Sequence, residues 1–248
     1  LNSCVNANNS ALSPPPETKW VNVEVKNPSP YTKPFPLEVT YISHKCQKKR
    51  ISGFDGSLVK EPSYKGIQIP LQQQEGSDIW QGKVAMTGGG SCGWTLSKFN
   101  LGIEYIDATH LGKELVPGTA VGATIAFDDD ASRNGKFDYI SSDLLKYSPK
   151  YYPMIIRWSK QKNGKTADKL YLFGKGDAFW DVRLYLNNKA DPLVSYHPII
   201  EENKIVEMLF PYEKKEGSMY TFVYPNGEKV LTTSIKPDFE KVDKLNVK

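Results

Sequence analysis

Apolar and polar residues alternate along much of the chain, with the period of two that marks a half-buried β-strand. Residues 20–25 and 37–42 show this alternation most clearly. Four prolines in residues 27–36 lack the N–H that a strand ladder needs, so a loop is expected there. Further strands are expected at residues 66–71, 79–86, 94–96, 101–106, 120–127, 137–140, 153–158, 169–173, 180–186, 204–210, 220–224 and 229–235.

Strand patterns recur about every 10 residues with turn residues between them, which is typical of an antiparallel sandwich. We therefore predict an all-β protein, with an antiparallel β-sandwich of immunoglobulin-like type in residues 17–146 and a second antiparallel β domain in residues 147–248. Asn163-Gly164 and Pro225-Asn226-Gly227 are expected to be tight turns, because Asn and Gly accept a positive φ. Residues 141–146 are expected to form one capped helical turn.

The first 16 residues are polar, contain no Lys or Arg, and end in three prolines. Such a segment buries too little apolar surface to offset its backbone entropy, so a disordered tether is expected over residues 1–16. Leu1-Asn2-Ser3-Cys4 resembles a bacterial lipobox, which predicts a lipid on Cys4, and Val5 fits sorting to the outer membrane. An ordinary free cysteine in the tail is the alternative.

Two further cysteines, Cys46 and Cys92, are the number that one disulfide requires. Export would permit the bond, and closing the loop between them would remove about 4 kcal/mol of unfolded-state entropy. Two buried, reduced thiols are the alternative. The chain has no Cys-x-x-Cys pair and no Cys/His cluster, so no structural zinc site is expected.

The composition excludes several classes of protein. Thirty-two basic and 28 acidic residues give a formal net charge of +4, which is too small to indicate nucleic-acid binding. No stretch approaches the roughly 18 consecutive apolar residues of a membrane-spanning helix. The overall amino-acid composition also excludes an intrinsically disordered protein, a collagen and a coiled coil.

An acidic segment after the strand expected at residues 120–127 has the spacing of a calcium-binding loop of the EF-hand type. Its sixth position is Gly135, where the chain must turn sharply, but its twelfth is Ser141 instead of the usual bidentate Glu. Calcium is therefore one expectation and an acidic hairpin tip with no cofactor is the other. The five ligand positions would be Asp130, Ser132, Asn134, the backbone of Lys136, and Asp138.

Residues 89–93 match the G-x-S-x-G pattern of a serine nucleophile, with Ser91 at its centre. That motif needs a strand followed by a helix, whereas residues 94–97 alternate like another strand. Asp181 and His197 would complete a triad by order alone. A glycine-rich hairpin is the preferred interpretation, and the protein is not expected to be an enzyme.

Three stretches, residues 52–57, 67–71 and 88–97, resemble small enterobacterial lipoproteins that are encoded beside type VI secretion phospholipase effectors and act as their immunity proteins. The resemblance covers about residues 37–106. It implies a periplasmic protein, held at the outer membrane by a lipid on Cys4, which binds and neutralises the effector. We expect it to be a monomer when free. A secreted carbohydrate-binding or adhesive β module, stabilised by calcium, is the alternative.

Loops on a rigid scaffold are where binding residues concentrate. The acidic loop 128–135 and the aromatic loop 174–180 are the predicted contacts with the effector. The short basic run Lys48-Lys49-Arg50 is interpreted as a solvated loop, with contact to lipid headgroups or an anionic partner as the alternative. The predicted partner-binding residues are Asp128, Asp129, Asp130, Arg133, Phe179 and Trp180.

Overall fold

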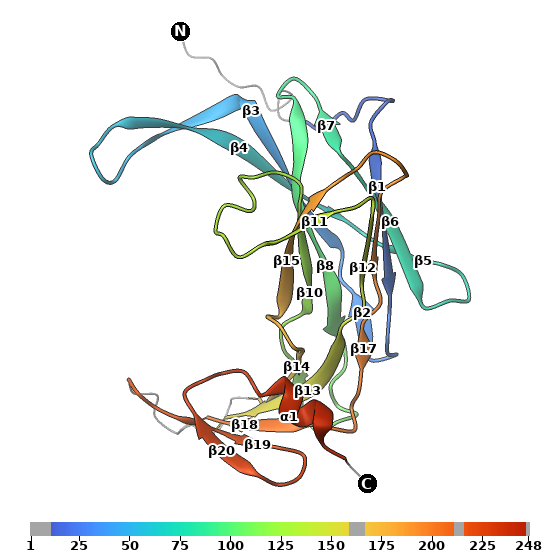
Figure 1. The fold of residues 1–248 in the computed structure, drawn as a ribbon, viewed down its shortest axis with the longest axis vertical. Helices are drawn as coiled ribbons and strands as arrows, with labels where there is room; N and C mark the ends of the chain where they lie inside the picture. The colour runs from blue at the N-terminus through green and yellow to red at the C-terminus, as the bar shows by residue number, and fades with distance from the viewer. Residues whose placement is uncertain (1–10, 159–166, 211–215, 247–248) are drawn as a thin grey trace.

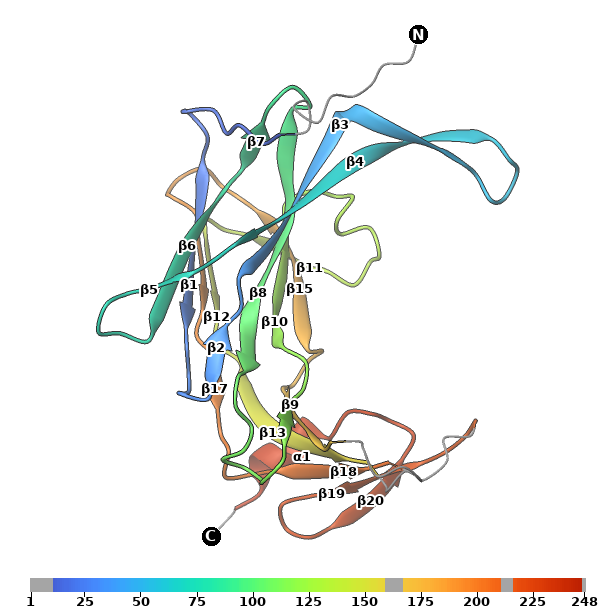
Figure 2. The same cartoon turned by 180° about the vertical axis from the view of Figure 1, so that it is seen from behind.

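The computed structural model describes residues 11–158, 167–210 and 216–246. Within these residues the chain forms twenty strands and one short helix, so the predicted all-β class is confirmed. Two layers of strands form the upper and middle part of the molecule, and a third sheet lies across its lower end (Figures 1 and 2). The expected turn at Asn163-Gly164 and the cysteine Cys4 lie outside the described residues.

One layer is a five-stranded sheet whose alternating apolar side chains face the core. In β1 (Trp20–Lys26) the alternate residues Val21, Val23 and Val25 are all buried, as the period of two predicts. In spatial order the strands are β12 (Leu144–Tyr147), β16 (Leu193–Tyr196), β1, β6 (Ile79–Ala85) and β5 (Gln72–Gln73).

The facing layer is a larger sheet that contributes to the same apolar core. Its strand order is β11 (Asp138–Ser141), β15 (Phe179–Tyr185), β10 (Val121–Ala126), β8 (Trp94–Tyr105), β3 (Leu37–Ile51) and β4 (Leu58–Ile69), with β2 (Thr32–Pro34) and β7 (Thr87–Gly89) paired to β8. Phe99, Leu101 and Ile103 of β8 share one core with the valines of β1, so the two layers form a β-sandwich. Its immunoglobulin-like subtype stays a prediction.

Strand pairing in the sandwich is mixed, although the sequence predicted antiparallel pairing. β1 pairs with β6 in antiparallel fashion and with β16 in parallel, and β15 is parallel to both of its neighbours, β10 and β11. Both β15 and β16 follow residue 147 in the chain. The expected boundary between residues 146 and 147 therefore does not divide the chain into a sandwich and a separate domain.

The third sheet has its own core. Its strand order is β20 (Lys229–Thr232), β19 (Tyr220–Val223), β18 (Val206–Leu209), β13 (Lys150–Arg157), β14 (Lys169–Phe173) and β9 (Val116–Pro117), with β17 (Ile199–Ile200) paired to β13. Tyr152, Met208 and Phe222 pack there against Val242 of helix α1 (Phe239–Lys244). The expected turn between β19 and β20 is present, with Gly227 at a φ of 85°.

The expected helical turn over residues 141–146 is wrong, because residues there belong to β11 and β12. Asp143 does not cap a helix. Its carboxylate instead accepts hydrogen bonds at 2.8–3.0 Å from the backbone N–H groups of four consecutive residues, 187–190. This contact draws the β11–β12 connection onto the loop between β15 and β16. Contacts with a distant loop have therefore replaced the helical turn that the local pattern predicted.

The prediction of a disordered tether is wrong for residues 11–16, since this segment lies against the sandwich. Residues 1–10 lie outside the described residues. Ser13 forms a β-bridge with Gly89 and donates its N–H to the carbonyl of Gly88 at 2.8 Å. A Cβ on Gly89 would lie 2.2 Å from the Ser13 carbonyl oxygen, and one on Gly90 would lie 2.3 Å from that of Ala11. The glycine run thus leaves room for the N-terminal segment to dock.

β3 and β4 extend beyond the sandwich as a free, two-stranded ribbon, which we call the β-arm and define as residues 43–65 (Figures 1 and 2). β3 pairs with β8 only over residues 38–42, and beyond them its partner is β4 alone. The register between β3 and β4 shifts between Ser43 and Lys48, at the root of the β-arm. An isolated two-stranded hairpin is marginally stable in water, so the root needs support.

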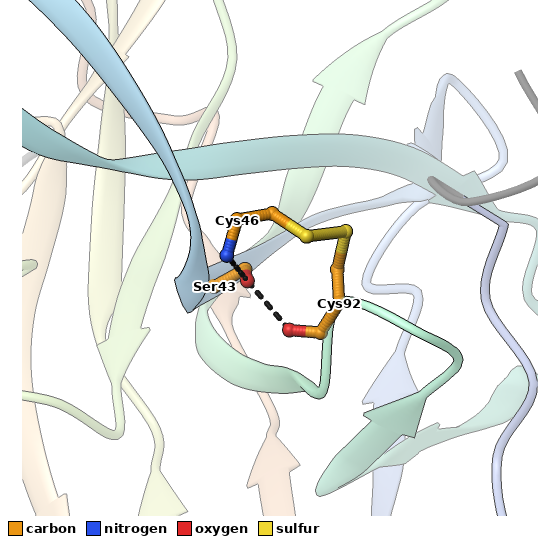
Figure 3. The surroundings of a disulfide bond; sticks show 3 residues. All are labelled: Ser43, Cys46 and Cys92. Atoms are coloured by element: carbon orange, nitrogen blue, oxygen red, sulfur yellow. Dashed lines mark hydrogen bonds between the residues drawn. A yellow bond between two sulfur atoms is a disulfide. The ribbon is translucent and has the colours of Figure 1, made fainter. Parts of the chain in front are cut away.

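The predicted disulfide supplies that support. Cys46, at the root of the β-arm, is bonded to Cys92 in the turn between β7 and β8, with the two Cα atoms 5.3 Å apart. The buried hydroxyl of Ser43 donates to the Cys92 carbonyl at 2.5 Å and accepts from the Cys46 N–H at 3.0 Å (Figure 3). The prediction of a Cys46–Cys92 disulfide is confirmed, and the bond joins the β-arm to the sandwich.

Candidate binding site

A hollow of about 560 Å³ opens beside the predicted aromatic pair Phe179 and Trp180, at the start of β15. The wall includes Tyr147 of β12 and Tyr151 of β13, together with the loop 174–177. Strands from both the sandwich and the third sheet therefore contribute to it. A cavity of this volume is within the range of small-molecule sites and of pockets that receive an anchoring side chain.

β15 lies between two parallel neighbours, and this position orients the aromatic pair. Phe179 is opposite Gly122 and Trp180 is opposite Ala123 on β10. The Trp180 indole N–H donates to Asp138 Oδ2 at 2.6 Å. That hydrogen bond joins β15 to the first residue of β11 and fixes the orientation of the indole.

A row of stacked tyrosines supports the Trp180 ring from below the hollow. The centroids of Tyr147 and Trp180 are 4.6 Å apart, and those of Tyr147 and Tyr196 are 5.6 Å apart. The hydroxyls of Tyr151 and Tyr196 are hydrogen-bonded at 2.8 Å within the core. Burial raises the pKa of both phenols above the ordinary value, so they stay neutral. Tyr151 lines the hollow as part of its aromatic floor, and Tyr196 supports it without lining the hollow.

Charged groups of both signs surround this aromatic floor. Burial raises the pKa of Asp181 above its ordinary value, and the nearby Asp177 carboxylate adds to the effect. Lys175 forms an ion pair with Glu240 at 3.4 Å, and both side chains are exposed. Lys136 also lines the hollow. Mixed charge around rigid rings suits the recognition of a polar partner surface with an apolar anchor.

The acidic loop, the second predicted contact, does not line the hollow. Asp129 forms an ion pair with Arg183 at 3.2 Å, and Asp130 forms ion pairs with Arg133 and with His44, the latter at 3.6 Å. Of the residues in or next to this loop, Lys136 and Asp138 line the hollow, and the partner-binding candidates Asp128, Asp129, Asp130 and Arg133 do not. The structure therefore places the aromatic loop at the hollow and leaves the four candidates of the acidic loop outside its lining.

The side chains at four of the five calcium-ligand positions engage protein groups in this structure, and Asp130 does so through Arg133. The Ser132 hydroxyl donates to the Asp128 carbonyl at 3.3 Å, Asn134 Oδ1 accepts from the Lys136 N–H at 3.2 Å, and Asp138 holds Trp180. Across residues 11–158, 167–210 and 216–246, no group of three or more His, Cys, Asp or Glu side chains is placed to hold a metal ion. Calcium binding stays a prediction.

The acid and base of the hypothetical serine triad are not bonded to each other. His197 Nε2 is 2.7 Å from Glu24 Oε1, and the Asp181 carboxylate is hydrogen-bonded to Thr124. Ser91 lies in the turn between β7 and β8, beside the disulfide. The site geometry therefore supports binding and gives no support to acyl transfer through these three residues.

Sequence reasoning missed a polar cluster near the end of β8. Glu202 accepts from the Tyr105 hydroxyl at 3.1 Å and lies 2.7 Å from His110 Nε2. The His110 ring is stacked on Tyr31 with centroids 3.6 Å apart. These four residues come from three separate parts of the chain and carry no shared motif, so only the fold reveals the cluster.

Comparisons with known proteins add no relative: no protein-family model, curated protein or solved structure matches this chain. The described part of the chain contains no helix that is both long and apolar enough to cross a bilayer. Function must therefore be argued from the sequence and from the geometry of the sites.

Proposed function

We propose that this protein is an immunity protein, which binds a type VI secretion phospholipase effector in the periplasm and neutralises it by covering its active site or lipid-binding surface. A lipid on Cys4 would hold it at the outer membrane. The three segments that resemble such lipoproteins support the proposal. The Cys46–Cys92 disulfide also supports it, because such bonds persist in exported proteins. The role requires stable binding and no catalysis.

The aromatic hollow is the observation that carries the proposal. Binding energy at protein interfaces concentrates in a few rigid aromatic or arginine anchors beside well-packed pockets. Trp180 meets this description, because Asp138 and Tyr147 hold its ring in place beside an open cavity. We expect an effector loop to enter the hollow and to pack against Trp180 and Phe179.

The test measures binding and phospholipase inhibition with the purified effector encoded beside this gene. Trp180→Ala should weaken binding by about 30-fold or more, the loss expected when a hot-spot residue is removed. Tyr139→Ala is the matched control, because Tyr139 is a 61 % exposed aromatic residue on the neighbouring strand β11 and does not line the hollow. Submicromolar binding that both variants leave intact would reject the hollow as the interface, and the absence of any binding would reject immunity.

A carbohydrate-binding module is the second candidate, and the same hollow favours it. Its volume suits a small ligand, and an aromatic ring beside carboxylates offers an apolar face together with hydrogen-bond acceptors. Glycan-array binding that is lost in Trp180→Ala and kept in Tyr139→Ala would favour this function over immunity. If that binding required calcium, the predicted calcium-binding loop would be part of the carbohydrate-binding function.

A further inference from the structure

The tip of the β-arm exposes apolar side chains that the protein leaves uncovered. Phe54 is 99 % exposed, and Ile51 and Leu58, on the two strands that lead to it, are each 72 % exposed. The turn that carries Phe54 is nevertheless ordered: the Ser52 N–H donates to the Ser57 carbonyl at 2.7 Å, and Ser57 donates to the Asp55 carboxylate. The tip therefore presents a shaped apolar surface to the solvent.

The β-arm also carries the net charge of the protein. Six of the 32 basic residues and two of the 28 acidic residues lie between residues 43 and 65, so this segment has a formal charge of +4, equal to that of the whole chain. One of its two carboxylates, Glu61, is paired with Arg50, and the other, Asp55, is bonded to Ser57. The rest of the chain is formally neutral.

A second hollow, of about 590 Å³, lies at the root of the β-arm beside the disulfide. Lys45, Lys48 and Lys65 line it, together with Tyr64 and Trp94. Several ammonium groups around one concave surface suit an anionic group such as a phosphate. An apolar tip with basic residues behind it is the arrangement of proteins that bind at a membrane surface.

We propose that the β-arm is a membrane-binding element that lies against a surface of anionic phospholipids, independently of any lipid on Cys4. Phe54, Ile51 and Leu58 enter the headgroup region, while the lysine side chains extend along the ribbon to reach lipid phosphates. The docking of the N-terminal segment agrees with this orientation, since Ser13 pairs with Gly89 at the end of β7, and the turn after β7 holds the disulfide at the root of the β-arm. A second anchor of this kind would fix the orientation of the protein on the bilayer.

The experiment uses the full 248-residue chain with Cys4→Ser, so that no acyl chain contributes to binding. It is sedimented with vesicles of phosphatidylcholine alone and with vesicles of an equimolar mixture of phosphatidylcholine and phosphatidylglycerol. We expect binding to the mixed vesicles only, weakened by added salt. Replacing Lys48 and Lys49 together with Ser should lower the partition coefficient by about fivefold for each lysine, about 25-fold for the pair. Phe54→Ser should lower it as well.

A matched control lies on the third sheet, where Lys229 and Leu231 of β20 offer an exposed basic residue and a 64 % exposed apolar residue. Replacing both with Ser should leave vesicle binding unchanged. A second readout is a polarity-sensitive fluorophore on Phe54→Cys, which is the single free thiol once Cys4 is replaced and Cys46 and Cys92 are bonded. Its emission should shift to the blue on mixed vesicles, because the tip enters the headgroup region.

Two results would overturn the membrane proposal. One is the absence of any binding that depends on phosphatidylglycerol, and the other is equal binding by the β-arm variants and the control variant. If the β-arm variants instead weaken binding to the effector, the β-arm contacts a protein and the assignment to a membrane is wrong. The role of the aromatic hollow is tested separately by Trp180→Ala, so failure of one proposal leaves the other standing.

Discussion

The disulfide between Cys46 and Cys92 gives the sharpest prediction about stability, because one covalent bond supports a whole projecting element. Reduction of the protein leaves every side chain in place and removes only the link between the β-arm and the β7–β8 turn. We expect two effects: a loss of global stability, and a larger, local loss of order in the β-arm.

The size of the global effect follows from the loop that the bond closes. The cysteines are 46 positions apart, and the loop-entropy relation gives about 4 kcal/mol for a loop of this length. The local effect follows from the pairing, because beyond residue 42 β3 has no partner except β4. Without its brace, this ribbon depends on the Ser43 hydrogen bonds and on its own ladder.

The assay compares the oxidised and the reduced chain, both with Cys4→Ser, by urea denaturation and by amide hydrogen exchange. The urea midpoint should fall by about 1 M on reduction. Amides of the β-arm should exchange much faster in native buffer, whereas those of β1 and β6 should keep their protection. Ser43→Ala serves as a control with the disulfide intact, and should cost about 1–3 kcal/mol by leaving buried backbone groups without their partner.

A stability change below about 1 kcal/mol on reduction would refute the loop-entropy reasoning for this bond. Unchanged exchange in the β-arm would refute the argument that the disulfide supports it. If all strands lost protection together, the β-arm would belong to the same cooperative unit as the sandwich, and the two effects would not be separable.

Three further predictions concern Gly89, Asp143 and the acidic loop. Gly89→Ala should displace the N-terminal segment and speed exchange of the Ser13 amide, whereas Gly93→Ala, which has a similar positive φ but open space around its Cβ, should not. Burial disfavours the Asp143 carboxylate, but four backbone N–H donors outweigh it and hold its pKa below the ordinary value. Asp143→Asn should therefore lower the Tm at neutral pH. The difference in Tm between the variant and the wild type should become smaller as the pH falls below about 4, because protonation of Asp143 then removes the stabilisation by its carboxylate from the wild type as well. Millimolar calcium should leave the Tm unchanged, because the acidic loop already bonds to protein groups. A rise in Tm of several degrees would instead support the predicted calcium-binding loop.

The local pattern of apolar and polar residues was sufficient to predict a strand wherever one face of the strand is exposed to solvent and the other is buried in the core. The alternation in β1 predicted its three buried valines, and the count of two cysteines besides Cys4 predicted the disulfide. The same reasoning missed most of the β-arm, because nearly all residues of its outer part are exposed on both faces of the ribbon. A ribbon without a buried face does not require apolar and polar residues to alternate, so its sequence pattern predicts a loop.

The binding site was predictable in its residues but not in its assembly. Phe179 and Trp180 were predicted as partner-binding residues, whereas Tyr147 and Tyr151, which complete the hollow, were not. The acidic loop was assigned to the same interface, but none of its residues lines the hollow, and Arg183 and Arg133 pair with its carboxylates. The order of strands in the sheet decides which residues come into contact, and β15 pairs in parallel with β10 and β11, which lie far from it in the sequence.

The sequence by itself determined the all-β class, the identity of many strands and the cysteine pair, because these depend on the period of two along a strand and on a simple count. Only the tertiary structure decided that the sandwich takes strands from both halves of the chain, that the glycine run receives the N-terminal segment, and that the β-arm stands free. The physical reason is that a strand's own residues fix which face is buried, whereas its neighbours are chosen by long-range pairing and packing that no local pattern encodes.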